Sequence, residues 1–277
     1  MRDYSPLIEF ELFQPLDIEP WLRGDDNNAY LSGYQLSQGY LRLNVGNQTL
    51  MEYSPEIWAH WGAEPPSFAD QLLWRIHMDL VEDLGKFLEP IPRDLEWWMM
   101  PQRDTPCVRW IALCMHAWNS HETVDCSFLA DRIRDALAGR SLPFDRLVEA
   151  PDISIWASDD EVVVGWDNRA KLVDGIPVWT AQQGTQRFAR DDFLAEIQDF
   201  RDRYFDAMRR QLALVRGGLV RQGVQVDIER DELTLGSEQA RKLSEYLSTP
   251  FRGEPVNWDA VRSALKQTLD LTGLKLT

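Results

Sequence analysis

Residues 152–168 read DISIWASDDEVVVGWDN and decide the β part of the fold. The runs ISIW and EVVVGW are rich in β-branched and aromatic residues, which is typical of β-strands. Ala157 to Asp160 join them as a short acidic connection that favours a turn. The stretch therefore predicts a β-hairpin whose tryptophans, Trp156 and Trp166, fill the core and whose carboxylates lie at the tip.

Further turns follow the hairpin along the chain. Val173-Asp174-Gly175 is a turn signal, since glycine and aspartate both tolerate positive φ. In VWTAQQGTQRFA, residues 178–189, the central Gln183-Gly184-Thr185 predicts another hairpin. We therefore expect three or four antiparallel strands here, with Trp179 on a strand next to the first two.

An earlier hairpin is predicted in GYLRLNVGNQTLMEY, residues 39–53. Leu41, Leu43 and Val45 alternate with polar residues, which is the period of a strand with one buried face. Gly46-Asn47 then supplies a two-residue turn, and the chain returns from Thr49.

The longest predicted element is an amphipathic helix from Asp191, a favourable N-cap, to about Arg216, where Gly217-Gly218 can end or bend it. Helical spacing continues for more than seven turns. We expect this helix to be the main packing element of the fold. Its apolar residues are Phe193, Ile197, Phe200, Tyr204, Met208, Leu212, Val215 and Leu219.

Shorter elements complete the prediction. A helix from about Asp70 to Leu88 is stopped by Pro90 and Pro92, and its polar face carries carboxylates. The fold class is therefore α+β, with antiparallel hairpins packed on several helices. We expect residues 1–277 to form a single compact unit, with a possible internal seam near residues 90–106 between an acidic N-terminal lobe and a C-terminal lobe. The remaining predictions are helices at 107–118, 127–138, 237–247 and 257–271, and a strand at 224–228.

The chain is strongly acidic, with a net charge of −16 over 277 residues. Residues 1–150 carry 24 acidic and 12 basic side chains, so most of the excess lies in the N-terminal half. Nucleic acids and anionic membranes are polyanions that a binding protein must neutralise, so both are excluded as main partners. A basic protein is the partner that such a surface attracts. The charge also keeps a protein soluble, which is its alternative explanation.

The N-terminal sequence MRDYSPLIEF lacks the basic start and apolar run of a signal peptide. Three cysteines are an odd number, which fits a reducing compartment. No window approaches the roughly 18 apolar residues that a membrane-spanning helix needs. We therefore expect a soluble cytoplasmic protein.

Catalytic and cofactor motifs are missing from the sequence. There is no nucleophile elbow, no Walker lysine loop, no zinc-protease motif and no dinucleotide fingerprint, so we expect no cofactor. Cys114, His116, His121 and Cys126 are near one another, but their spacing does not match structural zinc sites. We therefore expect no metal, and the same residues show no local signature of a cysteine nucleophile.

Carboxylates beside tryptophans leave a catalytic alternative open. A glycoside hydrolase uses one carboxyl group as acid and another as base or nucleophile, and an aromatic side chain can stack on the sugar. Asp159, Asp160 and Glu161 at the hairpin tip, joined by Asp167 after Trp166, offer such a set near Trp156 and Trp166. Asp79, Glu82 and Asp83 on one helix face are a second set of carboxylates. The non-catalytic interpretation is that acidic residues commonly occur at turns and on solvated helix faces.

Twelve tryptophans are many for this length, and most are expected in the core. Trp58 and Trp61, which follow Ser54-Pro55-Glu56, are the best candidates for partly exposed aromatics that hold a partner. The candidate partner-binding residues are therefore Trp58, Trp61, Asp79, Glu82, Asp83, Asp159 and Asp160.

The run ISIWASDDEVVVGWDNRAKLVDGIPVWTAQQG, the DDFLAEIQDF start of the long helix and the earlier YQLSQGYLRLNVGNQTLMEYS together resemble an uncharacterised family of bacterial proteins. The W-D-N and P-V-W-T pieces are the most specific marks, and the likeness covers roughly residues 30–220. The family has no catalytic residues to carry over. The resemblance implies a small acidic protein of the kind that often serves as an immunity protein against a basic toxin.

The favoured function is therefore non-catalytic protein binding, with inhibition of a toxin by masking its active site. Hydrolysis of a glycan by paired carboxylates is the alternative, and a ligand-sensing accessory domain is a third possibility. The sequence carries no signal for a particular oligomeric state.

Overall fold

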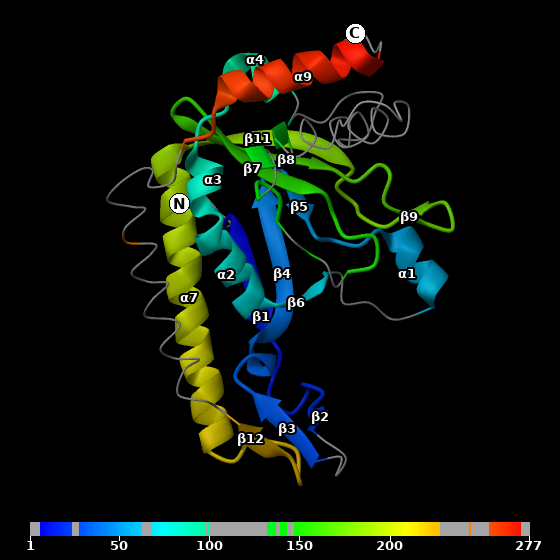
Figure 1. Cartoon of the computed structure of the whole chain (residues 1–277). Coiled ribbons are helices and arrows are strands. Elements are labelled where there is room, and N and C mark those ends of the chain that lie inside the picture. The colour runs from blue at the N-terminus through cyan, green and yellow to red at the C-terminus, as the bar shows by residue number, and fades with distance from the viewer. Residues whose placement is uncertain are drawn as a thin grey trace.

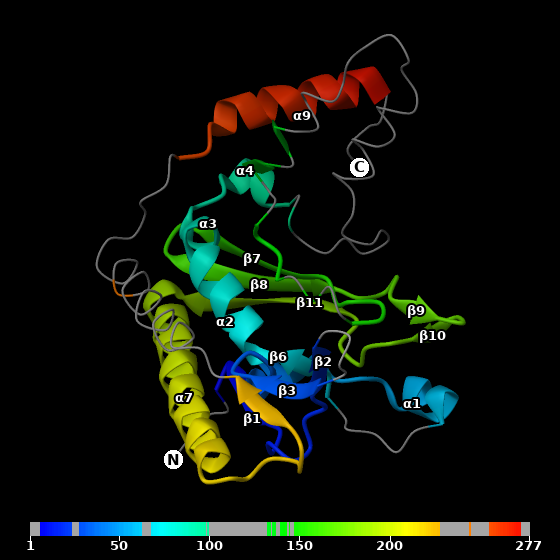
Figure 2. The same ribbon diagram turned by 60° about the horizontal axis from the view of Figure 1, so that its bottom comes forward.

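A computed structural model describes residues 6–23, 28–62, 68–97, 99, 147–227 and 255–272, together with residues 132, 133, 135, 136, 139–142, 144 and 244 (Figures 1 and 2). Antiparallel sheets and helices alternate along the chain, which confirms the α+β class. The described elements are β1 (Ile8–Leu12), β2 (Trp21–Arg23), β3 (Asn28–Ser32), the 3-10 helix η1 (Gln35–Ser37), β4 (Gln38–Val45), β5 (Gln48–Leu50), α1 (Pro55–Trp61), β6 (Asp70–Leu72), α2 (Leu73–Glu82), α3 (Leu84–Leu88), α4 (Arg93–Glu96), β7 (Ile153–Ser158), β8 (Glu161–Asp167), β9 (Leu172–Val173), β10 (Ile176–Pro177), β11 (Gln183–Ala189), α7 (Arg190–Arg216), β12 (Gln225–Asp227) and α9 (Trp258–Thr272).

The first sheet has the strand order β1-β4-β5, and β6 also pairs with β4. The predicted hairpin is confirmed, since β4 and β5 are joined at Gly46-Asn47, where Gly46 has φ 62°. Leu41, Leu43 and Val45 of β4 are buried and alternate with half-exposed residues. One face of this sheet therefore belongs to the main core.

The second sheet has the order β11-β8-β7 and contains the hairpin of residues 152–168. Asp159 and Asp160 form the turn, and Asp159 has φ 52°. β8 is buried on both faces: Val162 and Val164 contribute to the main core, whereas Val163 and Trp156 contribute to a second core with α4 and α9. This explains why the EVVVGW run is apolar without alternation. Figure 2 shows α4 and α9 above this sheet and the first sheet below it.

The second hairpin predicted at Gln183-Gly184-Thr185 is wrong, because these residues begin the continuous strand β11, which pairs with β8 along its length. Gly184 is a packing position: a Cβ atom there would lie 2.2 Å from the Trp166 ring. Trp179 does not lie on a named strand either. It forms an isolated bridge with Tyr53. The turn at Asp174-Gly175 is confirmed between β9 and β10.

The predicted long helix is confirmed as α7, which ends where Gly217 and Gly218 follow, the latter with φ 90°. Its predicted N-cap is wrong, because the helix already begins at Arg190 and Asp191 lies inside its first turn. In Figure 1 it extends from the second sheet to the small sheet β12-β3-β2. Phe200 packs edge-on against Phe10 of β1, with ring centroids 5.6 Å apart. α7 thus packs on the second and first sheets and extends to the small sheet β12-β3-β2, as expected for the main packing element.

The single helix predicted from about Asp70 to Leu88 is wrong in two ways. Residues 70–72 form β6, because pairing with Gln38–Tyr40 of β4 overrides their helical pattern. The helical part is then divided at Asp83, which has φ −90° and ψ −2°, into α2 and α3.

The C-terminal predictions are confirmed where the structure describes them. Asn257 caps α9, since its Oδ1 atom accepts a hydrogen bond from the backbone N of Ala260 at 3.1 Å. β12 agrees with the strand predicted at 224–228 and pairs in parallel with β3. Outside the described residues lie the helix predicted at 107–118, most of the helices predicted at 127–138 and 237–247, and Cys114, His116, His121 and Cys126.

Candidate functional site

An arm made of α1 and the β9-β10 hairpin projects from the side of the molecule (Figure 2). Ser54 begins α1, since its Oγ atom accepts a hydrogen bond from the backbone N of Ile57 at 3.1 Å, and Pro55 occupies the first helical position. Gly62, with φ 66°, ends the helix. The sequence Ser-Pro-Glu therefore fixes a short, well-capped helix that presents two tryptophans.

Backbone hydrogen bonds attach α1 to the distant segment around Trp179. Ser54 N donates to Val178 O at 2.8 Å, and Thr180 N donates to Glu52 O at 2.9 Å. At the outer end of the arm, His60 Nε2 and Asp174 Oδ2 are 3.0 Å apart. The arm is thus held at both ends.

Four aromatic side chains form a continuous cluster on this arm. Tyr53 stacks on Trp179 with ring centroids 4.6 Å apart, and it meets Trp58 and Trp61 edge-on at 5.0 and 5.4 Å. Burial, with a further contribution from Asp70, raises the pKa of Tyr53 from 10.0 to about 12. The phenol therefore stays protonated at neutral pH and acts as a packing group.

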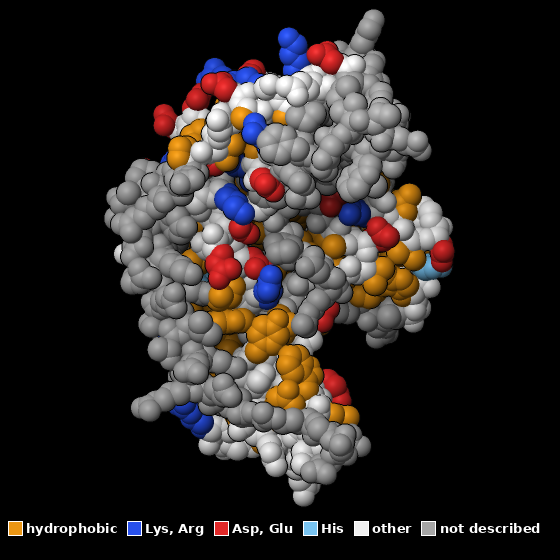
Figure 3. Space-filling view, in the orientation of Figure 1, with side chains coloured by type: hydrophobic (Ala, Val, Ile, Leu, Met, Phe, Trp, Pro, Cys, Tyr) orange, Lys and Arg blue, Asp and Glu red, His pale blue; other side chains and the backbone are white. Residues whose placement is uncertain are grey.

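The cluster reaches the surface through its two outer members. Trp61 is 37% exposed, Trp58 is half-buried, and Trp179 is buried. Figure 3 shows hydrophobic side chains gathered at the α1 end of the molecule, with acidic side chains beside them. We call this surface the aromatic arm patch; it consists of Tyr53, Trp58 and Trp61 and the neighbouring carboxylates Glu52, Glu56, Asp70 and Asp174.

The three carboxylates predicted for the polar face of the helix at 70–88 do not share one environment. Asp79 is buried, contrary to the prediction, and accepts a hydrogen bond from Arg75 Nε at 2.9 Å. Glu82 is exposed at the end of α2. Asp83 is half-buried and lies 3.6 Å from Lys86. Burial raises the pKa of both Asp79 and Asp83, so neither is a well-solvated charge for a partner.

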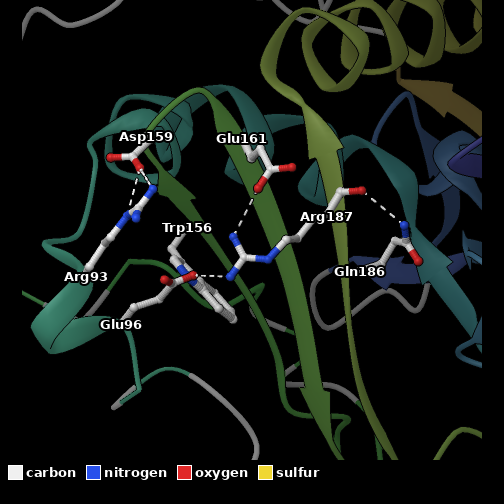
Figure 4. Close-up of polar contacts among 7 residues, drawn as sticks. All are labelled: Arg93, Glu96, Trp156, Asp159, Glu161, Gln186 and Arg187. Atoms are coloured by element: carbon white, nitrogen blue, oxygen red, sulfur yellow. Dashed lines mark hydrogen bonds and ion pairs between the residues drawn. The ribbon is translucent and has the colours of Figure 1, made fainter.

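The hairpin tip lies near α4 and the start of α7, at a different end of the molecule from α1 (Figure 1). Asp159 Oδ2 is 2.5 Å from Arg93 Nη2, and this ion pair is visible in Figure 4. The backbone O of Asp160 accepts a hydrogen bond from Arg190 N. The seven predicted residues therefore occupy separate surfaces, and Trp58 and Trp61 alone lie together on the aromatic arm patch.

Sequence reasoning missed a polar cluster between α4 and the second sheet (Figure 4). Arg187 donates to Glu96 at 2.6 Å and to Glu161 at 3.2 Å, and Trp156 Nε1 donates to Glu96 at 3.4 Å. Glu96 is buried, and Arg187 neutralises it. The cluster joins α4 to the sheet. Glu96 lies 60 positions from Trp156 and 91 from Arg187 in sequence, so no local pattern predicts the contact.

The glycan-hydrolase alternative gains no support from the tryptophans beside these carboxylates. Trp156 is fully buried and Trp166 is 5% exposed. Neither ring presents an open face on which a sugar could stack.

Within the described ranges, no group of three or more His, Cys, Asp or Glu side chains is placed to hold a metal ion. No helix in those ranges is long and apolar enough to cross a membrane.

The fold and the arm define an α+β protein with a projecting aromatic surface. The sequence model of the family of unknown function DUF5984 matches residues 7–264. The chain belongs to this family, which confirms the resemblance to an uncharacterised family. No curated protein and no solved structure matches the chain.

Proposed function

We propose that the protein is a non-catalytic protein-binding module of the immunity type, which neutralises a basic bacterial toxin in the cytoplasm by masking its active site. The observation that carries the proposal is the aromatic arm patch. Trp61 and Trp58 are accessible at the end of a firmly held arm, and carboxylates flank them. Large aromatic side chains surrounded by a polar rim are the usual composition of a binding hot spot.

The charge of the protein supports a basic partner. A net charge of −16 attracts a cationic protein over long range and speeds the encounter. Glu56 and Asp174 on the arm would face basic side chains of the toxin, while Trp61 inserts into an apolar depression. The aromatic contact then sets the dissociation rate, and the charges set the association rate.

The decisive experiment is a pull-down with the purified protein from its native lysate at low and moderate salt, with co-purifying proteins identified by mass spectrometry. We expect one basic partner in stoichiometric amount, whose toxic activity the protein suppresses. Trp61→Ala should weaken this binding by about 30-fold, the loss typical of a hot-spot residue.

The matched control is Trp21→Ala. Trp21 lies on β2, in the small sheet with β3 and β12 and not on the arm, and is 42% exposed, which is similar to Trp61. The proposal fails if no partner appears in either buffer, or if the two tryptophan variants bind equally well.

A further inference from the structure

The outer edge of β1 pairs with no further strand in the described part of the chain. Asn44 N donates to Leu7 O, and Phe13 N donates to Gln38 O, so the odd-numbered residues of this segment direct their backbone groups toward β4. In an antiparallel pair the direction alternates with each residue. The backbone N–H and C=O groups of Ile8, Phe10 and Leu12 therefore point away from the sheet.

Side chains of α7 cap this edge at its two ends. Arg203 Nη2 donates to Ile8 O at 2.7 Å, and Gln211 Nε2 donates to the O atom of Phe13, the residue that follows the end of β1. Between these caps, the outward backbone groups of Phe10 and Leu12 have no hydrogen-bond partner in the described part of the chain. The uncapped segment is thus short and sits in the middle of the strand.

A groove lies over this uncapped segment, with β1 as one wall and α7 as the other. Its volume is about 580 Å³, within the range of sites that hold a ligand. The small side chain of Ala207 leaves room between the walls. Residues that line the groove include Phe10, Glu11, Leu12, Ala207, Arg210 and Leu214.

We propose that this groove binds an extended peptide segment of a partner protein, which adds to β1 as a further strand. Unpaired backbone groups beside a helix are what strand addition requires: the main chain provides the affinity, and side-chain contacts on alternate positions provide the specificity. The inference goes beyond the proposed function and does not depend on it, since the groove lies outside the aromatic arm patch.

Charge complementarity defines the peptide. Phe10 packs against α7, so the side chain of Glu11 points to the opposite face of the strand, where its charge acts on Tyr40. Arg210 lies on the helix side of the groove together with Arg203 and Asp206, which are already paired with Asp199 and Arg209. Neither Glu11 nor Arg210 forms an ion pair with another described residue. The matching strand therefore carries an acidic side chain between apolar ones toward α7 and basic side chains on its other face.

The test uses a blocked heptapeptide, TVKEKVT, in which valines and glutamate share one face and lysines the other. Its control is TKKEVVT, which has the same composition and charge without the alternation. With isotope-labelled full-length protein, we expect TVKEKVT to slow amide hydrogen exchange at Phe10 and Leu12 by about tenfold or more at saturation. The control peptide should leave both amides unchanged.

Two variants test the backbone hydrogen bond and the ion pair separately. Leu12→Pro removes an outward N–H that the sheet does not use, and proline is tolerated at such edge positions; we expect TVKEKVT to bind about fivefold more weakly, as for one lost hydrogen bond. Arg210→Ala should weaken binding about threefold, as for one exposed ion pair. Arg216→Ala, on the same helix but outside the groove, should have no effect.

The proposal is overturned if TVKEKVT fails to bind at millimolar concentration, if both peptides bind equally, or if binding leaves Phe10 and Leu12 unprotected. The Trp61→Ala variant should bind the peptide like the unmodified protein. The groove and the arm are therefore tested independently.

Discussion

Arg140 and Glu89 form an ion pair that is almost wholly removed from water, with side chains 1% and 7% exposed and Nη2 and Oε2 3.1 Å apart. Arg140 also donates to the backbone O atoms of Lys86, Glu89 and Ala136, while Glu89 Oε1 accepts from Val256 N at 2.6 Å. Burial lowers the pKa of Arg140 to about 10 although Glu89 opposes this shift, so the guanidinium remains charged at neutral pH. The pair connects the end of α3 to the segment that leads into α9.

Removing one member of this pair should be costly. We expect Arg140→Ala to lower the free energy of unfolding by about 3 to 5 kcal/mol, because the Glu89 charge and three carbonyl groups lose their partner in the interior. Urea denaturation measures the change. Arg93→Ala is the control, since its ion pair with Asp159 is exposed and should contribute at most about 1 kcal/mol. Equal losses in the two variants would contradict this account.

Gly184 and Trp166 should be energetically coupled. Gly184→Ala places a methyl group against the Trp166 ring, and we expect a loss of about 1 to 3 kcal/mol from overpacking. In a Trp166→Leu background the same substitution should cost less, because the smaller side chain vacates the space. A double-mutant cycle by chemical denaturation measures the coupling, and simple additivity would show that the ring is not the obstacle.

Tyr53 should ionise at a higher pH than an ordinary tyrosine. Its pKa of about 12 in the folded protein lies above the value of 10.0 for an ordinary tyrosine. Between these two values the folded state keeps a proton that the unfolded state releases, so stability should fall as the pH rises from 10 to 12. Tyrosinate absorbance measures the titration, and Tyr53→Phe should remove one ionisation step near pH 12. In urea that step should return to about pH 10, and a step that does not move would rule out burial as its cause.

Local patterns in the sequence predict the local structure well. Short stretches whose propensity and periodicity agree with the fold predict three turns and the long helix. These are the turns at Gly46-Asn47, Asp159-Asp160 and Asp174-Gly175 and the helix near Asp191. Gly184 misled the prediction, because a strand glycine that accommodates a ring has the same sequence signal as a turn glycine. The difference lies in Trp166 on the neighbouring strand.

The candidate site was only partly predictable for the same reason. Trp58 and Trp61 could be selected as accessible because they follow the Ser54 cap on a short helix. Their support comes from Trp179, more than a hundred residues further along, and no periodicity connects these positions. Asp79 was predicted to be exposed because a helical wheel places it on the polar face of the helix. In the structure this side of α2 faces the core, and Asp79 is buried.

β8 belongs to two cores at once, with Val162 and Val164 on one face and Val163 on the other. Neither core can lose its packing without uncovering a face of the same strand, so the two should melt as one cooperative unit. β8 also lies between β7 and β11, so its backbone is paired with a neighbouring strand on both sides. A substitution in the core under α9 should therefore also lower the stability of the core under α7, because the apolar run of β8 contributes to both.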